Sequence, residues 1–241
     1  MNNPHEIKIV HSSDLHIVQN GGQSEKEGAQ YLERVLATAN SLAVDLVLLA
    51  GDTFDHNRVS DELIAHAADL LGDSQLPVVI LPGNHDPLTE DSVYHRGGVA
   101  DLENVSVLGL THQQTIHYEA LELEIWGNAH LDYRNMIPLR DPPKRQHRWH
   151  IAMAHGHYDD AIDAAQKYRP SWLINDAELA ATNADYVALG HWNIAKSVGA
   201  QNIPAHYSGS PDHAETVNIV ELIQPGTVNV SRHSSGDFTI L

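Results

Sequence analysis

The chain has 241 residues, with 14 Lys and Arg, 32 Asp and Glu, 18 His, no Cys and a formal net charge of −18. The absence of Cys excludes a disulfide framework, a thiolate zinc site and a cysteine nucleophile. The excess of acidic residues disfavours a protein that binds long nucleic acid through its overall electrostatic field, although it leaves local contacts with nucleic acid open. Because His is the commonest metal ligand, the positions of the histidines are the first question.

Strand-like and helix-like segments alternate in the first half of the chain. Residues 7–10, 46–50 and 78–81 are apolar runs, as in strands covered on both faces. Residues 25–42 carry apolar side chains at helical spacing, and a second helix follows the N-cap residue Ser60. This order predicts an α/β domain with parallel strands, in which functional residues gather at the carboxyl ends of the strands.

The second half has shorter strand candidates, at residues 105–108, 115–118, 121–126, 151–154, 186–189, 217–222 and 227–230. The first three are closely spaced, which is typical of a meander, and the last two flank a Gln-Pro-Gly turn and predict a hairpin. We expect one domain over residues 1–241, with 234–241 as a loose tail. With no signal-peptide core and no run of about 20 apolar residues, we expect a cytoplasmic protein with no membrane partner.

Polar side chains of metal-binding type follow five of these strands. The clusters are Asp14-Leu15-His16, Gly51-Asp52-Thr53-Phe54-Asp55, Gly83-Asn84-His85-Asp86, His155-Gly156-His157 and Gly190-His191-Trp192-Asn193. If the strands share a sheet, the clusters meet at one edge, where carboxylate, imidazole and amide groups suit Mn²⁺, Fe or Zn²⁺. Seven candidate ligands are too many for one tetrahedral ion and suit two ions that share a carboxylate, a phosphoester-cleaving arrangement. These candidates are Asp14, His16, Asp52, Asn84, His155, His191 and Asn193.

The five clusters together resemble the calcineurin-like metallophosphoesterase superfamily, whose motifs run D-x-H, GD-x-x-D, GNH[DE], H and GH-x-H. The resemblance implies a four-layer α/β/β/α sandwich with two mixed sheets and a binuclear metal site at the strand ends. It implies two divalent ions and a phosphoester substrate. We expect Mn²⁺ as the favoured metal, with Fe or Zn²⁺ as alternatives, and a small substrate because the chain is acidic. Many members form dimers, so a homodimer stays open.

The resemblance also implies a role for each metal ligand. Asp14 and His16 match ligands of the first metal, and Asp52 matches the carboxylate that bridges the two ions. The ligands of the second metal correspond to Asn84, His155 and His191. A hydroxide held between the ions is the implied nucleophile.

Two further residues of the same motifs match catalytic positions. His85 corresponds to the acid that assists the leaving oxygen, and Asp86 is expected to orient it. Asp55 is expected to support a ligand through a hydrogen bond.

One position departs from the family pattern. Asn193 stands where the superfamily usually has the last histidine of the first metal site, and an amide oxygen is a neutral, harder ligand. We therefore hypothesise a first site that is weaker and biased toward Mn²⁺. Three nearby histidines, unranked, are candidates to compensate: His56, His206 and His213.

Substrate contacts are less specific. His157 either touches a substrate phosphate or faces solvent, and Trp192 either stacks on the substrate or packs in the core. Arg145, in the basic proline loop 140–148, either binds a substrate phosphate or belongs to a solvated face.

A narrower resemblance leads to the DNA double-strand-break-repair exonuclease branch. It rests on Ser12-Ser13-Asp14-Leu15-His16, on Gly51-Asp52-Thr53-Phe54-Asp55 and on Tyr207-Ser208-Gly209-Ser210. We expect the chain to lack the capping domain that this branch usually adds, and we expect its charge to repel a phosphate polymer. We therefore expect a phosphodiesterase. A repair-type exo- or endonuclease, a phosphomonoesterase and a non-catalytic scaffold are the alternatives.

Overall fold

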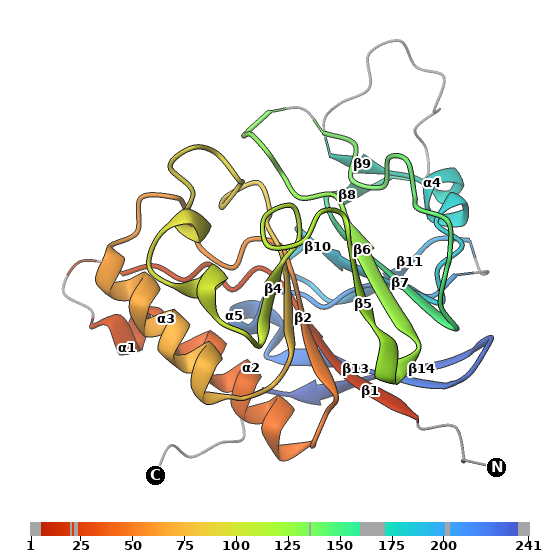
Figure 1. Ribbon diagram of the computed structural model, residues 1–241, viewed down its shortest axis with the longest axis horizontal. Helices are drawn as coiled ribbons and strands as arrows, with labels where there is room; N and C mark the ends of the chain where they lie inside the picture. Colours follow the sequence, from red (N-terminus) through yellow and green to blue (C-terminus); the bar gives the residue numbers. More distant parts are fainter. Residues whose placement is uncertain are drawn as a thin grey trace.

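The computed structural model describes residues 6–19, 21, 24–134, 136–159, 172–200 and 203–235. Two six-stranded mixed sheets pack face to face (Figure 1). The first has the order β14-β13-β1-β2-β3-β4 and the second β11-β12-β10-β7-β6-β5, and β8 and β9 form a small third sheet.

The strands of the first sheet are β1 (Ile7–Ser12), β2 (Leu46–Ala50), β3 (Val78–Leu81), β4 (Val105–Val107), β13 (Thr216–Gln224) and β14 (Thr227–Ser234). Those of the second are β5 (Thr115–Tyr118), β6 (Leu123–Gly127), β7 (Trp149–His155), β10 (Tyr186–Gly190), β11 (Lys196–Val198) and β12 (Ala205–Tyr207), and the third holds β8 (His157–Tyr158) and β9 (Leu173–Ile174). The α-helices are α1 (Glu25–Gly28), α2 (Gln30–Ser41), α3 (Asp61–Asp73), α4 (Asp176–Ala181) and α5 (Pro211–Ala214), with 3₁₀ turns at Val93–His95, Val99–Asp101 and Glu119–Leu121.

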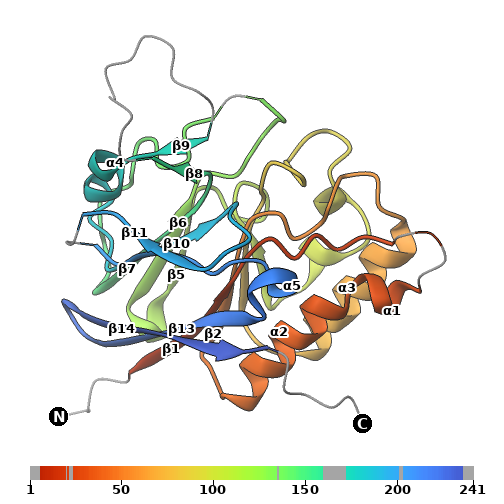
Figure 2. The same cartoon turned by 180° about the vertical axis from the view of Figure 1, so that it is seen from behind.

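Parallel pairing brings five strand ends to one edge of the molecule. In the first sheet β1, β2, β3 and β4 are parallel neighbours, and the antiparallel β13–β14 hairpin, predicted from the sequence, continues the sheet beyond β1 (Figure 2). In the second sheet β12, β10, β7 and β6 are parallel, with β11 and β5 as antiparallel edges.

The continuous apolar strands are explained by burial on both faces. In β2, Leu46, Leu48 and Ala50 face the second sheet, whereas Val47 and Leu49 pack toward the helices. Helices α2 and α3 cover the outer face of the first sheet, as Figure 1 shows. The Ser60 side chain caps α3 by accepting a hydrogen bond from the Leu63 backbone, as predicted.

The predicted fold class, an α/β fold with two mixed sheets, is confirmed. The outer face of the second sheet is covered by α4, β8, β9 and irregular chain, so this fourth layer is thinner in helix than the first. No described helix is long and apolar enough to cross a bilayer. The first two residues of the predicted tail are ordered, because β14 reaches Ser234 and the Ser235 backbone N–H donates to Glu215 O. Residues 236–241 lie outside the described residues.

Two sequence predictions of local structure are wrong. The expected meander over 105–126 does not form, because β4 pairs with β3 in the first sheet whereas β5 and β6 pair in the second. The expected helix over 25–42 is two helices, since Ala29 leaves helical geometry at φ −106° and ψ 9°. The apolar pattern of closely spaced strands does not specify whether β4 joins the same sheet as the β5–β6 hairpin.

Candidate metal centre and active site

The loops that follow β1, β2, β3, β7 and β10 converge on one site. Backbone bonds join them: Asp14 N donates to Gly51 O at 3.0 Å and His16 N to Asp52 O at 3.1 Å. The Asp14 carboxylate accepts the backbone N–H of His191, which crosses from one sheet to the other. The predicted convergence of the strand ends is therefore present in the structure.

The side-chain atoms of the predicted ligands form two groups that share one residue, Asp52. Asp14, His16 and Asp52 place ligand atoms within 4.8 Å of one another, and so do Asp52, His155 and His191. Asn84 joins the second group, with its Oδ1 at 3.1 Å from His155 Nε2. A carboxylate common to two groups is the arrangement expected of two neighbouring cations.

Two of the predicted ligand histidines are held through one ring nitrogen, Nδ1. His155 Nδ1 lies 2.9 Å from Ala50 O, and His16 Nδ1 lies 2.9 Å from Asp55 Oδ1. Such bonds fix the tautomer that leaves Nε2 free to coordinate. The expected supporting role of Asp55 thus fits its position.

Glycines make room for this crowding. A Cβ on Gly51 would lie 2.0 Å from His155 Nδ1, one on Gly83 would lie 2.2 Å from Asp52 Oδ1, and one on Gly190 would lie 1.8 Å from Ala50 O. These contacts are far below van der Waals distance. The strand ends can therefore meet around Asp52 and His155 only without side chains at these positions.

Four of the predicted ligands adopt backbone conformations that non-glycine residues rarely use. Asp14, His16 and Asp52 have φ values of 55°, 47° and 50°, and His191 has 104°. Such conformations cost of order 1–3 kcal/mol each and persist where the surrounding structure enforces them. Their concentration at one edge points to a functional site.

The charges of the centre are unbalanced without a cation. Burial by itself lowers the pKa of His155, but the Asp52 carboxylate, with help from Asp14, raises it to about 9. Burial raises the pKa of Asp14, which is 1 % exposed. Burial and neighbouring His155 together lower the pKa of His191 to about 4. Buried carboxylates that draw a proton onto an adjacent imidazole fit a site for positive charge, and O and N donors suit divalent transition ions.

His85 borders the centre, but Asp86 does not orient its ring as we expected. The Asp86 carboxylate is buried and accepts hydrogen bonds from Gly83 N, Phe54 N and the Tyr94 hydroxyl. It thereby fixes the loop that carries His85. The His85 ring itself is held by Asp55, whose backbone carbonyl oxygen lies 2.8 Å from His85 Nδ1. The His85 side chain is 44 % exposed.

The structure brings Asn193 to a cavity beside His16. Asn193 is exposed and lines this cavity of about 460 Å³ together with His16, Asp55 and His213. Of the three histidines considered as compensating ligands, His213 shares this cavity, whereas His206 stacks on Tyr186 in the second sheet and His56 bonds to the Arg58 backbone.

The predicted substrate contacts separate into two groups. His157 is exposed near His191 and accepts a hydrogen bond from Trp192 Nε1 at 2.9 Å, while Trp192 stacks on Tyr207 at 4.3 Å. Of the two alternatives for Arg145, the contact with a substrate phosphate does not fit the structure. The Arg145 guanidinium binds Asp185, just before β10 begins, so it lies at the opposite end of the strands from the site.

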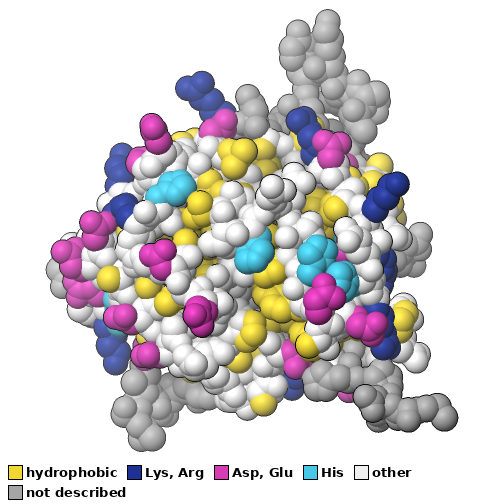
Figure 3. Space-filling model, in the orientation of Figure 1, with side chains coloured by type: hydrophobic (Ala, Val, Ile, Leu, Met, Phe, Trp, Pro, Cys, Tyr) yellow, Lys and Arg dark blue, Asp and Glu magenta, His cyan; other side chains and the backbone are white. Residues whose placement is uncertain are grey.

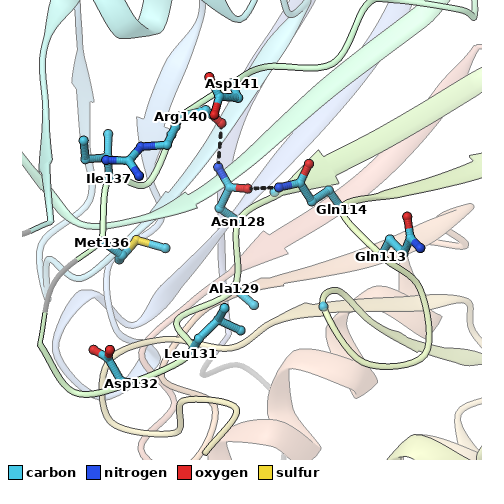
Figure 4. Close-up of a pocket in the computed structure, with 12 residues that line it drawn as sticks. Gln113, Gln114, Asn128, Ala129, Leu131, Asp132, Met136, Ile137, Arg140 and Asp141 are labelled. Atoms are coloured by element: carbon cyan, nitrogen blue, oxygen red, sulfur yellow. Dashed lines mark hydrogen bonds between the residues drawn. The ribbon is translucent and has the colours of Figure 1, made fainter.

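The sequence analysis did not single out His130. His130 is fully buried and its Nε2 lies 3.0 Å from His155 O. It follows β6, which is parallel to β7, so the rule used for the other strand ends applied here too. Beside it Ala129 lines a cavity of about 520 Å³, in which the Gln114 side chain donates to Asn128 (Figure 4).

A family model for the calcineurin-like phosphoesterases matches residues 7–194, which span every one of these ligand clusters. The chain belongs to this family.

Relatives place the chain near DNA-repair nucleases. It is 21 % identical to the DNA double-strand break repair protein Mre11 of Methanopyrus kandleri over 86 % of this chain and 49 % of that protein. It is 24 % identical to the D component of the nuclease SbcCD of Bacillus subtilis over 91 % of this chain and 67 % of that protein. The chain therefore spans about half the length of the first relative.

Solved structures share the fold. The protein TT1561 of Thermus thermophilus matches with a TM-score of 0.63 and 11 % identity, over 96 % of this chain and all of that one. A putative 5'-nucleotidase from Staphylococcus aureus matches with a TM-score of 0.62 and 14 % identity, over 98 % of this chain and 56 % of that one.

Proposed function

We propose that the chain is a phosphodiesterase that uses two divalent metal ions, with Mn²⁺ as the favoured metal. The observation that carries the proposal is the pair of ligand groups that share Asp52. Asp14, His16 and Asn193 would hold one ion, Asn84, His155 and His191 would hold the second, and Asp52 would serve both. Divalent ions bound there would lower the pKa of water toward neutrality and neutralise charge on phosphoryl oxygens.

The protein supplies the surroundings of that chemistry. Asp55 binds both His16 Nδ1 and, through its carbonyl, His85 Nδ1, so it sets the ring planes of a ligand and of the general acid together. The two rings meet edge to face at 4.7 Å. In this proposal the exposed His85 ring gives a proton to the leaving oxygen as the ester bond breaks.

The test is hydrolysis of bis(p-nitrophenyl) phosphate against p-nitrophenyl phosphate, with Mn²⁺, Zn²⁺ or Fe²⁺ added. We expect the diester to be cleaved faster, with Mn²⁺ giving the highest rate. Asp52→Ala should abolish activity and remove metal, while the exposed-histidine variant His95→Ala should keep both. A higher rate on the monoester would instead indicate a phosphatase.

A DNA nuclease is the second candidate, because both named relatives are described by DNA repair or nuclease activity. The net charge of −18 opposes it. Cleavage of single- or double-stranded DNA with Mn²⁺, strongly weakened by salt, would favour the nuclease. Absence of cleavage under conditions that support diester hydrolysis would count against it.

A further inference from the structure

A second cluster of metal-binding side chains lies on the second sheet, away from the active site. His117 of β5 pairs in register with Glu124 of β6, and Glu124 pairs with His150 of β7. These three side chains therefore stand in a row on the outer face, and His147 reaches over them from the loop before β7. Figure 3 shows histidine and acidic side chains gathered over the β5–β6 edge.

Three atoms of this cluster form a nearly regular triangle. The Nδ1 atoms of His117 and His147 are 3.4 Å apart, and each lies near Glu124 Oε2, at 3.8 Å and 3.6 Å. Metal–nitrogen bonds of about 2.0–2.1 Å in a tetrahedral zinc site place neighbouring ligand atoms about 3.4 Å apart. The triangle thus has the size of three corners of such a site, slightly expanded.

The buried carboxylate is arranged to present one oxygen to this triangle. Glu124 is 1 % exposed, and its Oε1 accepts hydrogen bonds from Gln146 N and His150 Nδ1, both at 2.7 Å. Its Oε2 receives no hydrogen bond from the described residues. This oxygen lies near the Nδ1 atoms of both His117 and His147, so it is available as a metal ligand.

The surroundings of His147 fit a metal ligand as well. Its Nε2 lies 3.3 Å from Glu119 Oε1. When Nδ1 coordinates, the Nε2 proton is free to bond this carboxylate, which is the usual outer partner of a metal-bound histidine. The exposed His117 leaves a fourth corner open to solvent.

We propose that His117, Glu124 and His147 form a second, separate site for a divalent transition-metal ion, with Zn²⁺ as its natural probe. The site would fasten the β5–β6 hairpin to the loop before β7. His150 and the active-site ligand His155 are five residues apart on β7, about 16 Å at 3.3 Å per residue, and point to opposite faces. The proposal therefore does not depend on the function of the active site.

The test is zinc stoichiometry after equilibrium dialysis, measured in parallel for proteins with and without the active-site carboxylate Asp52. In the Asp52→Ala background we expect one bound equivalent that disappears when His117→Ala and His147→Ala are added. The control His95→Ala, an exposed histidine outside the described clusters, should keep it. Equal zinc content with and without the His117 and His147 substitutions would overturn the proposal.

A second measurement guards against misfolding of the double variant. His117→Ala alone removes an exposed edge residue and leaves the buried Glu124–His150 bond in place. An anomalous difference map at the zinc edge should show a peak between His117 and His147 in the parent protein and none in this variant. A parent crystal soaked in Zn²⁺ without that peak would also overturn the proposal.

Discussion

At the scale of residues, the geometry of the candidate centre depends on which ring nitrogen of each histidine already makes a hydrogen bond within the protein. Asp55 engages His16 and His85, and Ala50 O engages His155, so the free nitrogens are directed by bonds made at the far side of each ring. Asp86 is the instructive exception. Adjacent to His85 in sequence, it stabilises backbone and not the ring.

His85→Ala tests the division of roles. Because the ring is exposed and belongs to neither ligand group that shares Asp52, we expect both metals to stay bound while turnover falls by about 10²–10⁴-fold. Elemental analysis and steady-state kinetics on the diester measure the two effects. Loss of metal from this variant would show that His85 is a ligand.

Proton linkage tests the charge balance of the centre. The raised pKa of His155, about 9 against 6.5 when unfolded, contributes stability to the metal-free protein below about pH 6.5, and this is lost as pH rises toward 9. Since a ligand imidazole must be neutral, metal binding near pH 7 should release a proton.

We expect metal affinity to fall by about tenfold per pH unit below pH 9 for each proton displaced, and activity to fall below about pH 6. Calorimetry in buffers of different ionisation enthalpy counts the protons. An affinity independent of pH between 6 and 8 would contradict the assignment of His155. Asp52→Asn removes the carboxylate and should restore an ordinary, lower His155 pKa in the metal-free protein.

At the scale of elements, the site depends on strand ends that approach more closely than side chains allow. Gly190 of β10 packs on Ala50 of β2, so that a glycine of one sheet lies against the backbone of the other. The position is thus a contact between the two sheets as well as a turn beside His191.

Gly190→Ala should push these strand ends apart. We expect a loss of about 1–3 kcal/mol in the free energy of unfolding, with reduced metal content. Gly72→Ala in α3 is the matched control, because the added Cβ would meet only Leu102, at 3.4 Å. We expect this substitution to stabilise the helix by about 0.5–1 kcal/mol. Urea unfolding compares the two; equal effects would mean that the close contact is unimportant.

At the scale of the whole molecule, the charge of −18 bears on the substrate. Acidic side chains gather over the face of the molecule that carries α1 and α3 (Figure 3). A field of this sign repels phosphate polymers, and salt screens that repulsion.

We therefore expect kcat/KM for a small anionic diester to rise with ionic strength. A nuclease that binds the DNA backbone through counterion release would show the opposite dependence. Initial rates from low to physiological salt, at saturating Mn²⁺, measure the sign. A steep fall with salt would favour the nuclease.

The sequence by itself determined the α/β class, the sheet strands of the first half and the five polar clusters. Each depends on local signals: continuous apolar runs mark strands buried on both faces, and residues directly after parallel strands must meet at one edge. These signals singled out Asp14, Asp52, Asn84, His155 and His191 as candidate ligands.

Only the tertiary structure decided which distant groups touch. In the tertiary structure β4 and β5 belong to different sheets, and Arg145 lies at the far end of the strands from the candidate site. His130 contacts the backbone of His155, and the side chains of His117, Glu124 and His147 come together from three segments of the chain. The spacing of apolar residues in the sequence indicates only the periodicity of a single helix or strand. Contacts between elements follow from strand order and register, which are set by how the two sheets exclude water from their shared core.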